Sequence, residues 1–223
     1  MKRMLALLLA VCMLLCACGG AAESTEPTEP TEEVNIFKNS MQKSDPSQDE
    51  EFNLLLIGNS GCYYYVEELH GIAMADGIFM RVCNLYYSGA TVMQHHTWWK
   101  NGEAHYEYFI TNENGRVKAA GVNLEWCLQQ QNWDVISLQE SSTPYAASDP
   151  MAEMEVSKQW RTELWDHIKE QFPMSRYLWH QTWALQIGYT SGTYTISTVE
   201  EQTAYYEVVK EHSELIADTY GWE

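Results

Sequence analysis

Positive charge is scarce in this chain, which has 13 Lys and Arg residues against 31 Asp and Glu residues. The formal net charge of −18 repels phosphate backbones and anionic surfaces. Part of the negative charge is concentrated near the N-terminus, in residues 23–33. The composition therefore predicts no nucleic-acid partner.

Long apolar runs are also rare. One run, at residues 4–15, follows the positively charged Lys2 and Arg3. It is too short for a permanent membrane span but is typical of the core of a signal peptide. No later segment of the sequence is long and apolar enough to cross a membrane.

The apolar run ends in Leu-Cys-Ala-Cys-Gly-Gly at residues 15–20, which resembles a bacterial lipobox. The resemblance implies a lipoprotein signal peptide at residues 1–17 and a lipid on Cys18. Acyl chains there would hold the protein on the extracytoplasmic face of the cell membrane. The alternative is an ordinary secretory signal that is cut near Ala17 or Ala21.

The composition changes after the signal peptide. Residues 18–51 contain the candidate lipidated cysteine and an acidic segment rich in Thr, Glu and Pro, with few large apolar side chains. Such a segment cannot bury enough surface to fold, so it is interpreted as a solvated tether. Residues 52–223 are long enough to form one domain with a core of its own.

Cysteine is sparse in this domain. Cys62, Cys83 and Cys127 are an odd number, so at most two of them can pair. Cys62 and Cys83 could form a disulfide in an exported protein, or all three could be small buried thiols. The second interpretation is preferred.

Signals for strands and helices alternate along the domain. A continuous apolar run at residues 52–57 indicates a strand covered on both faces. Further strands are expected at residues 78–87, 134–139 and 177–183, with helices between them and after the last one. A hairpin around Asn114-Gly115 is expected as an insertion on the rim. This order predicts a three-layer α/β/α sandwich with a mostly parallel sheet.

The first candidate for chemistry is Gly-Asn-Ser at residues 58–60, directly after the first strand. A serine in such a turn has an exposed hydroxyl, and the helix N-terminus that follows favours a developing negative oxygen. Taken alone, the same three residues also form ordinary turns.

Three segments together carry a resemblance to a known family. They are Leu-Ile-Gly-Asn-Ser at residues 56–60, Trp-Asp-Val-Ile-Ser-Leu-Gln at 133–139 and Leu-Trp-His-Gln-Thr-Trp at 178–183. With these motifs the chain resembles the SGNH (GDSL-like) hydrolase superfamily, and within it a bacterial lipoprotein branch of unknown function. The resemblance covers about residues 52–223 and implies a flavodoxin-like SGNH fold.

The resemblance assigns roles to individual residues. It implies that Ser60 is the nucleophile, that the backbone N–H of Gly89 binds the oxyanion, and that the side chain of Gln139 stands where the superfamily usually has an asparagine donor. The backbone N–H of Ser60 would complete the oxyanion hole. Asn59 replaces the aspartate that is more common in the first motif.

The superfamily's general base has no counterpart here. That base is a histidine three residues after an aspartate, and no Asp-x-x-His occurs in the sequence. The chain is therefore expected to end before the last strand and the catalytic loop. A serine without a base is a poor nucleophile, so we expect this chain to be inactive or nearly so.

The histidines offer no clear substitute for the base. His180 lies on the fourth predicted strand and is interpreted as a structural residue; because of strand alternation, only one of His180 and Gln181 can point toward the site. His95 and His96 are adjacent on a helix and do not share a face, so they are interpreted as solvent-facing or rim residues. The sequence predicts no metal site and no cofactor.

The aromatic content is high, with nine Trp and fourteen Tyr. Trp183 flanks the expected site, and together with Asn59, His180 and Gln181 it is a candidate for lining the substrate. The resemblance implies a serine esterase acting on acyl or acetyl esters, either of small molecules or of extracellular or envelope glycans. The main alternative is a lipid-anchored carbohydrate-binding protein without catalysis.

Overall fold

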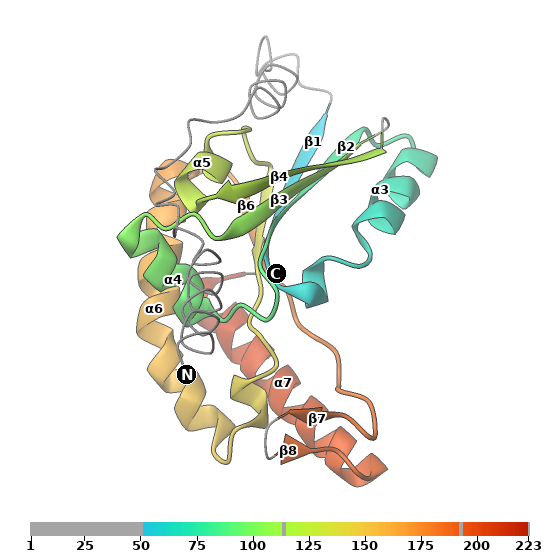
Figure 1. The fold of residues 1–223 in the computed structure, drawn as a ribbon, viewed down its shortest axis with the longest axis vertical. Helices are drawn as coiled ribbons and strands as arrows, with labels where there is room; N and C mark the ends of the chain where they lie inside the picture. Colours follow the sequence, from blue (N-terminus) through green and yellow to red (C-terminus); the bar gives the residue numbers. More distant parts are fainter. Residues whose placement is uncertain (1–50, 113–114, 192–193, 223) are drawn as a thin grey trace, which may run out of the picture. The chain divides into compact units, whose positions relative to one another are not determined.

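The computed structural model describes residues 51–112, 115–191 and 194–222 (Figure 1). The predicted signal peptide, Cys18 and the tether up to residue 50 lie outside these residues, as does Asn114 of the predicted turn. Within the described ranges, no helix combines the length and the apolar character that a membrane span requires.

The described elements alternate between strands and helices. In chain order they are β1 (Phe52–Gly58), η3 (Ser60–Cys62), α3 (Val66–Ala75), β2 (Met80–Tyr86), α4 (Val92–Asn101), β3 (Tyr106–Asn112), β4 (Gly115–Val122), α5 (Leu124–Leu128), β5 (Val135–Leu138), η4 (Pro144–Ala146), α6 (Pro150–Gln171), β6 (Arg176–Trp179), β7 (Thr190–Ser191), β8 (Tyr194–Thr195) and α7 (Val199–Tyr220). The four strands expected from the sequence correspond to β1, β2, β5 and β6.

The main sheet has six strands in the order β4-β3-β2-β1-β5-β6. β2, β1, β5 and β6 pair in parallel, whereas β3 and β4 are antiparallel. The carboxyl ends of β2, β1 and β5 therefore meet at one edge of the sheet. The predicted sites lie directly after these three strands.

Alternation along β1 explains the layers. Leu55 and Ile57 face a large cluster that includes side chains of α4, α5 and α6, whereas Leu54 and Leu56 face a smaller cluster that includes Val66 of α3. Figure 1 shows α3 on one side of the sheet and α4, α5 and α6 on the other. The predicted three-layer α/β fold with a mostly parallel sheet is confirmed.

The hairpin of β3 and β4 corrects one expectation. It is no insertion on the rim: β3 pairs with β2, so the hairpin extends the main sheet. Tyr106, Tyr108 and Ile110 of β3 are buried in the large cluster, because alternate residues of the added strand face the same core as β2. Pairing with β3 also satisfies the backbone groups on the outer edge of β2.

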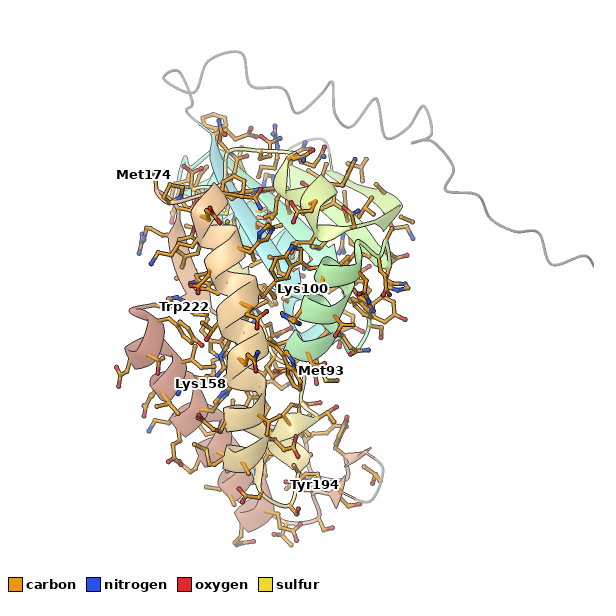
Figure 2. The ribbon with its side chains drawn as sticks, turned by 90° about the vertical axis from the view of Figure 1, so that its left-hand side faces the viewer. Met93, Lys100, Lys158, Met174, Tyr194 and Trp222 are labelled. Carbon is orange, nitrogen blue, oxygen red and sulfur yellow. The ribbon has the colours of Figure 1, made fainter. Side chains whose placement is uncertain are left out.

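A separate small cluster lies beyond the carboxyl edge of the sheet. It contains Tyr145, Met154, Ile196, Tyr205 and Val209 and joins η4, α6, the segment after β8 and α7. Figure 2 shows α6 with Met174 beyond one end and Tyr194 beyond the other. This cluster supports the loops that border the candidate site.

The three cysteines of the described part are free thiols, and all three are buried. Burial raises the pKa of Cys62 and of Cys83 to about 12. At neutral pH these thiols are protonated, which makes them poor nucleophiles. Cys62 instead packs beneath the turn that follows β1, where its thiol hydrogen-bonds to the carbonyl of Asn59.

Candidate active site

Ser60 begins the short helix η3 directly after β1. The preceding Asn59 caps this helix: its Oδ1 accepts the N–H of Gly61 at 3.0 Å, while its Nδ2 donates to the carbonyl of Ala90 at 3.0 Å. Asn59 is buried and Ser60 is half-buried. The capping asparagine therefore presents Ser60 at the surface and ties its turn to the chain that follows β2.

Gln139 lies beneath the Ser60 turn. Its side chain is fully buried, and its Oε1 accepts the N–H of Asn59 at 3.3 Å. Its Nε2 is buried without a hydrogen-bond partner among the described residues. A Cβ atom on Gly61 would lie only 2.3 Å from this Nε2, so the amide packs directly against the turn. In this arrangement Gln139 supports the turn from below; its role as an oxyanion donor stays a prediction.

Gly89 lies in the turn between β2 and α4. It is exposed and has a φ of 69°, a left-handed conformation that favours glycine. The backbone bonds around it run from Tyr87 N–H to the carbonyl of Gly58 and from Ala90 N–H to that of Tyr87, each 3.2 Å long. Among the described residues, the N–H groups of Gly89 and Ser60 bond to no acceptor. These are the two backbone donors that the sequence assigns to the oxyanion.

A cavity of about 450 Å³ opens at the Ser60 turn. The residues that line it come from this turn, from the segment after β5 and from the segment after β6: Asn59, Ser60, Gly61, Ser142, Thr182, Trp183, Ala184, Leu185, Gln186 and Tyr189. The side chain of Trp183 is 55% exposed there, a high value for so large an apolar ring. Ser60 thus lies in a cavity wall opposite an aromatic segment.

His180 differs from its prediction in one respect. β6 ends at Trp179, so neither His180 nor Gln181 lies on the strand, and strand alternation does not decide where they point. The last bond to β5 runs from His180 N–H to the carbonyl of Leu138; beyond it the chain leaves the sheet. The ring Nδ1 of His180 is 3.0 Å from the hydroxyl of Tyr65, and burial lowers the pKa of His180 to about 4. His180 is therefore neutral at pH 7 and is held by Tyr65, whereas Gln181 is exposed.

The prediction for His95 was wrong. Its side chain is fully buried, it stacks on Tyr106 with ring centroids 5.5 Å apart, and its Nδ1 is 2.8 Å from the Tyr106 hydroxyl. Val92, His95 and Trp98 form one buried stripe at a spacing of three residues, a pattern that is visible in the sequence. His96 turns away and bonds to Glu163 at 3.0 Å. In the described part of the chain, no group of three or more His, Cys, Asp or Glu side chains is placed to hold a metal ion.

Glu140 is the functional candidate that the sequence did not reveal. Its side chain is only 1% exposed, and its Oε1 accepts the N–H groups of Val92 and Ser141 at 3.0 and 2.8 Å. Burial raises the pKa of Glu140 to about 7, against the opposing effects of these two hydrogen bonds and of the charge of Arg161. It also borders a second cavity of about 530 Å³, on the α4 and α6 side of the 140–147 segment. A carboxylate directly after a buried strand was the available signal.

Residues 53–217 match the family described as "Domain of unknown function (DUF4886)". The chain belongs to the DUF4886 family. No curated protein matches the sequence.

Solved structures that resemble this DUF4886 chain include a family member from Bacteroides uniformis ATCC 8492. It has 24% sequence identity and a TM-score of 0.66, and the match covers 78% of this chain and 65% of that one. The likeness supports the fold, and this chain matches less than two thirds of the relative's length.

Two further structures with lower scores carry names of enzymes. A gut microbial diltiazem-metabolizing enzyme has 16% identity and a TM-score of 0.43, over 78% of this chain and 36% of its own. Phospholipase A1 from Streptomyces albidoflavus NA297 has 11% identity and a TM-score of 0.38, over 77% of each chain.

The DUF4886 site brings together part of the predicted machinery. The turns of Ser60 and Gly89 are joined through Asn59, and Gln139 packs below them. Among the described residues, no histidine or carboxylate hydrogen-bonds to the Ser60 hydroxyl. The arrangement presents a serine hydroxyl and two backbone N–H groups, and its described part supplies no base in contact with that hydroxyl.

Proposed function

We propose that this chain is a serine esterase of the SGNH type, with Ser60 as the nucleophile. The observation that carries the proposal is the turn after β1, where Ser60 lines a cavity of about 450 Å³. Asn59 ties this turn to the Gly89 turn, and the N–H groups of Ser60 and Gly89 are both without an acceptor in the described chain.

In the proposed reaction, the Ser60 hydroxyl attacks the acyl carbon of an ester. The carbonyl oxygen becomes negative and accepts hydrogen bonds from the N–H groups of Ser60 and Gly89. The bond to the alcohol then breaks, and the alcohol leaves with the proton of the Ser60 hydroxyl. Water hydrolyses the resulting acyl-serine, which releases the acid and restores Ser60. Each donor placed in this way contributes about 3 kcal/mol to lowering the barrier. Because no base in the described part takes the serine proton, we expect a low rate from this chain as it stands.

We propose an ester on a glycan as the substrate. Trp183 and Tyr189 line the cavity with Ser60, and exposed aromatic rings offer flat apolar faces on which sugar rings can stack. The signal-like segment at residues 4–15 and the lipobox-like Cys18 support an anchored protein on the extracytoplasmic face, where such glycans are accessible. Replacement of Cys18 by Ser should move the protein from the membrane fraction to the soluble fraction; an unchanged distribution would refute the anchor.

The nucleophile can be tested with the full chain. A fluorophosphonate should attach to Ser60, measured by intact mass, and added imidazole should accelerate 4-nitrophenyl acetate hydrolysis beyond its effect in buffer. Ser60→Ala should abolish both effects. Ser142→Ala is the matched control because Ser142 lines the same cavity, and it should leave both effects intact. Equal rates for wild type and Ser60→Ala would refute the esterase proposal.

A second candidate is a carbohydrate-binding protein without catalysis. The exposed Trp183 favours it, and so does the lack, among the described residues, of a base in contact with Ser60. Calorimetry with a soluble acetylated oligosaccharide separates the two candidates. Tight binding that Trp183→Ala removes, without turnover that depends on Ser60, would establish the binding function instead.

A further inference from the structure

The carboxylate of Glu140 is buried immediately beyond β5. One of its oxygens, Oε1, accepts two backbone N–H groups, from Ser141 at 2.8 Å and from Val92 at 3.0 Å. Both bonds join this one buried oxygen to backbone N–H groups, so removal of the side chain would break both attachments at once. Glu140 therefore holds the chain at Val92, which lies 48 residues away in the sequence.

Val92 is the first residue of α4 and lies three residues after Gly89. The intervening Ala90 is held from the other side, because its carbonyl accepts Nδ2 of Asn59 at 3.0 Å. The short segment from Gly89 to Val92 is thus fixed at two points, one through the Ser60 turn and one through Glu140. Gly89 is exposed and lies inside the turn that is closed by the bond from Ala90 N–H to the Tyr87 carbonyl, so the two attachments set where this turn and its N–H lie relative to Ser60.

Burying a carboxylate at the start of a helix costs desolvation free energy. Its burial disfavours the charged form, and the pKa of Glu140 rises to about 7 even though the bonds from the N–H groups of Ser141 and Val92, and then the charge of Arg161, oppose the rise. The neutral side chain of Thr91 already caps α4, with its Oγ1 accepting the N–H of Gln94. Glu140 adds what this local cap does not supply, an attachment between the start of α4 and the chain that follows β5.

We propose that Glu140 is a positioning residue that fixes the Gly89 N–H relative to Ser60 by holding the N–H of Val92. The inference rests on the proposed function, because a fixed donor matters only where an oxyanion forms. Misplacing a catalytic group by about 1 Å can cost about 100-fold in rate. Loss of the Glu140 contact should therefore lower the rate of reaction at Ser60 even under conditions in which the variant remains folded.

Full-chain variants separate this role from a structural one. Glu140→Ala removes the acceptor, whereas Glu140→Gln keeps a carbonyl oxygen for both N–H groups. Glu153→Gln is the matched control, because Glu153, like Glu140, borders the cavity of about 530 Å³ but is exposed. The measurements are the rate constant kinact and the affinity KI of fluorophosphonate attachment to Ser60, and amide exchange in the peptide that covers residues 87–92.

For Glu140→Ala we expect kinact to fall about 10-fold or more with little change in KI, together with faster exchange in residues 87–92. Glu140→Gln should retain kinact within about 3-fold, and Glu153→Gln should match wild type. If Glu140→Ala does not fold, Glu140→Asp replaces it; its shorter side chain should give the same selective loss of kinact.

Each remaining outcome has one meaning. A variant with faster exchange but wild-type kinact would overturn the positioning role, and so would unchanged exchange. If Ser60 is not labelled in the wild type, the proposed esterase function fails; faster exchange in Glu140→Ala would then show that the attachment exists but serves no oxyanion site.

Discussion

At the scale of single residues, the closest packing in the site is between Gly61 and Gln139. A Cβ atom on Gly61 would lie 2.3 Å from Nε2 of Gln139, and this amide is fully buried. Displacement of this amide would also disturb the bond from Asn59 N–H to Oε1 of Gln139, so Gly61→Ala should lower the free energy of unfolding by about 1–3 kcal/mol. Urea denaturation measures the change.

Gly71 provides the matched control for this substitution. It lies inside α3, and no atom approaches its missing Cβ within 4 Å. Gly71→Ala should therefore stabilise the chain by up to about 1 kcal/mol, because alanine is the better helix former. Two alanine variants with equal urea midpoints would show that the contact beneath Ser60 carries no strain.

The sequence placed Ser60, Asn59 and Gly89 in the right local settings, because each depends on a short motif at the end of a strand. It could not reveal the burial of Glu140. A carboxylate is ordinarily exposed, and this one is buried because the donor at Val92 comes from a helix 48 residues away. The burial of His95 could have been predicted from the spacing of Val92, His95 and Trp98, but its partner could not, because Tyr106 lies on β3 and only the fold brings the two rings together.

At the scale of elements, α4 and α7 begin with the same device. Thr91 and Gln94 form a capping box at α4, and Thr198 and Glu201 form one at α7. In each helix the threonine hydroxyl accepts a backbone N–H at 3.2 Å. Thr91→Ala and Thr198→Ala should each lower the free energy of unfolding by about 1 kcal/mol.

The two caps should differ in their effect on the site. Thr91 directly follows the Gly89-Ala90 turn, whereas Thr198 begins a helix after β8. We therefore expect only Thr91→Ala to reduce the rate of fluorophosphonate attachment to Ser60, measured well below both unfolding midpoints. Equal loss in the two variants would mean that general destabilisation, and not the Gly89 turn, controls the reaction.

Element boundaries show which parts of the fold the sequence encodes locally. β1 was found from its continuous apolar run, because burial on both faces leaves that signature in any parallel strand. β6 was predicted to reach residue 183 but ends at Trp179. Its length depends on β5, whose paired residues end at Leu138, so no local pattern specifies it. The place of the β3–β4 hairpin likewise depends on its partner β2.

At the scale of the whole molecule, buried titratable groups couple folding to pH. Burial lowers the pKa of His95 and His212 to about 3 and that of His180 to about 4. Below about pH 6.5, the unfolded chain binds protons at these three residues that the folded chain does not. Their effect on the free energy of unfolding is therefore favourable above pH 6.5 and is lost as the pH falls.

Glu140 acts in the opposite direction. Its pKa is about 7 in the folded chain and about 4.5 in the unfolded chain, so between these values the folded chain holds the additional proton. Its effect on stability weakens as the pH rises through this interval. From pH 4.5 to 6.5, the unfolded chain thus binds up to three more protons at the histidines, and the folded chain binds up to one more at Glu140. The net difference is up to two protons in favour of the unfolded chain.

The expected result is a free energy of unfolding that rises from pH 4.5 to 6.5 and then levels off or declines slightly toward pH 7. Two protons correspond to about 2.7 kcal/mol per pH unit, so the full rise is on the order of 5 kcal/mol as an upper limit. The lowered pKa of Glu163, bonded to His96, affects stability only below this interval. Urea denaturation at several pH values measures the curve.

Two variants show how much the buried histidines and Glu140 each contribute to the pH dependence of the free energy of unfolding. His212→Gln removes one of the three histidines at which only the unfolded chain binds a proton, so the rise in the free energy of unfolding should shrink by about half. Glu140→Gln removes the carboxyl group that binds a proton only in the folded chain, so the rise should become steeper. A curve that is flat from pH 4.5 to 6.5 would show that the buried imidazoles take up protons in the folded chain. His180 would then be free to ionise beside Tyr65, and the neutral state assigned to it here would be wrong.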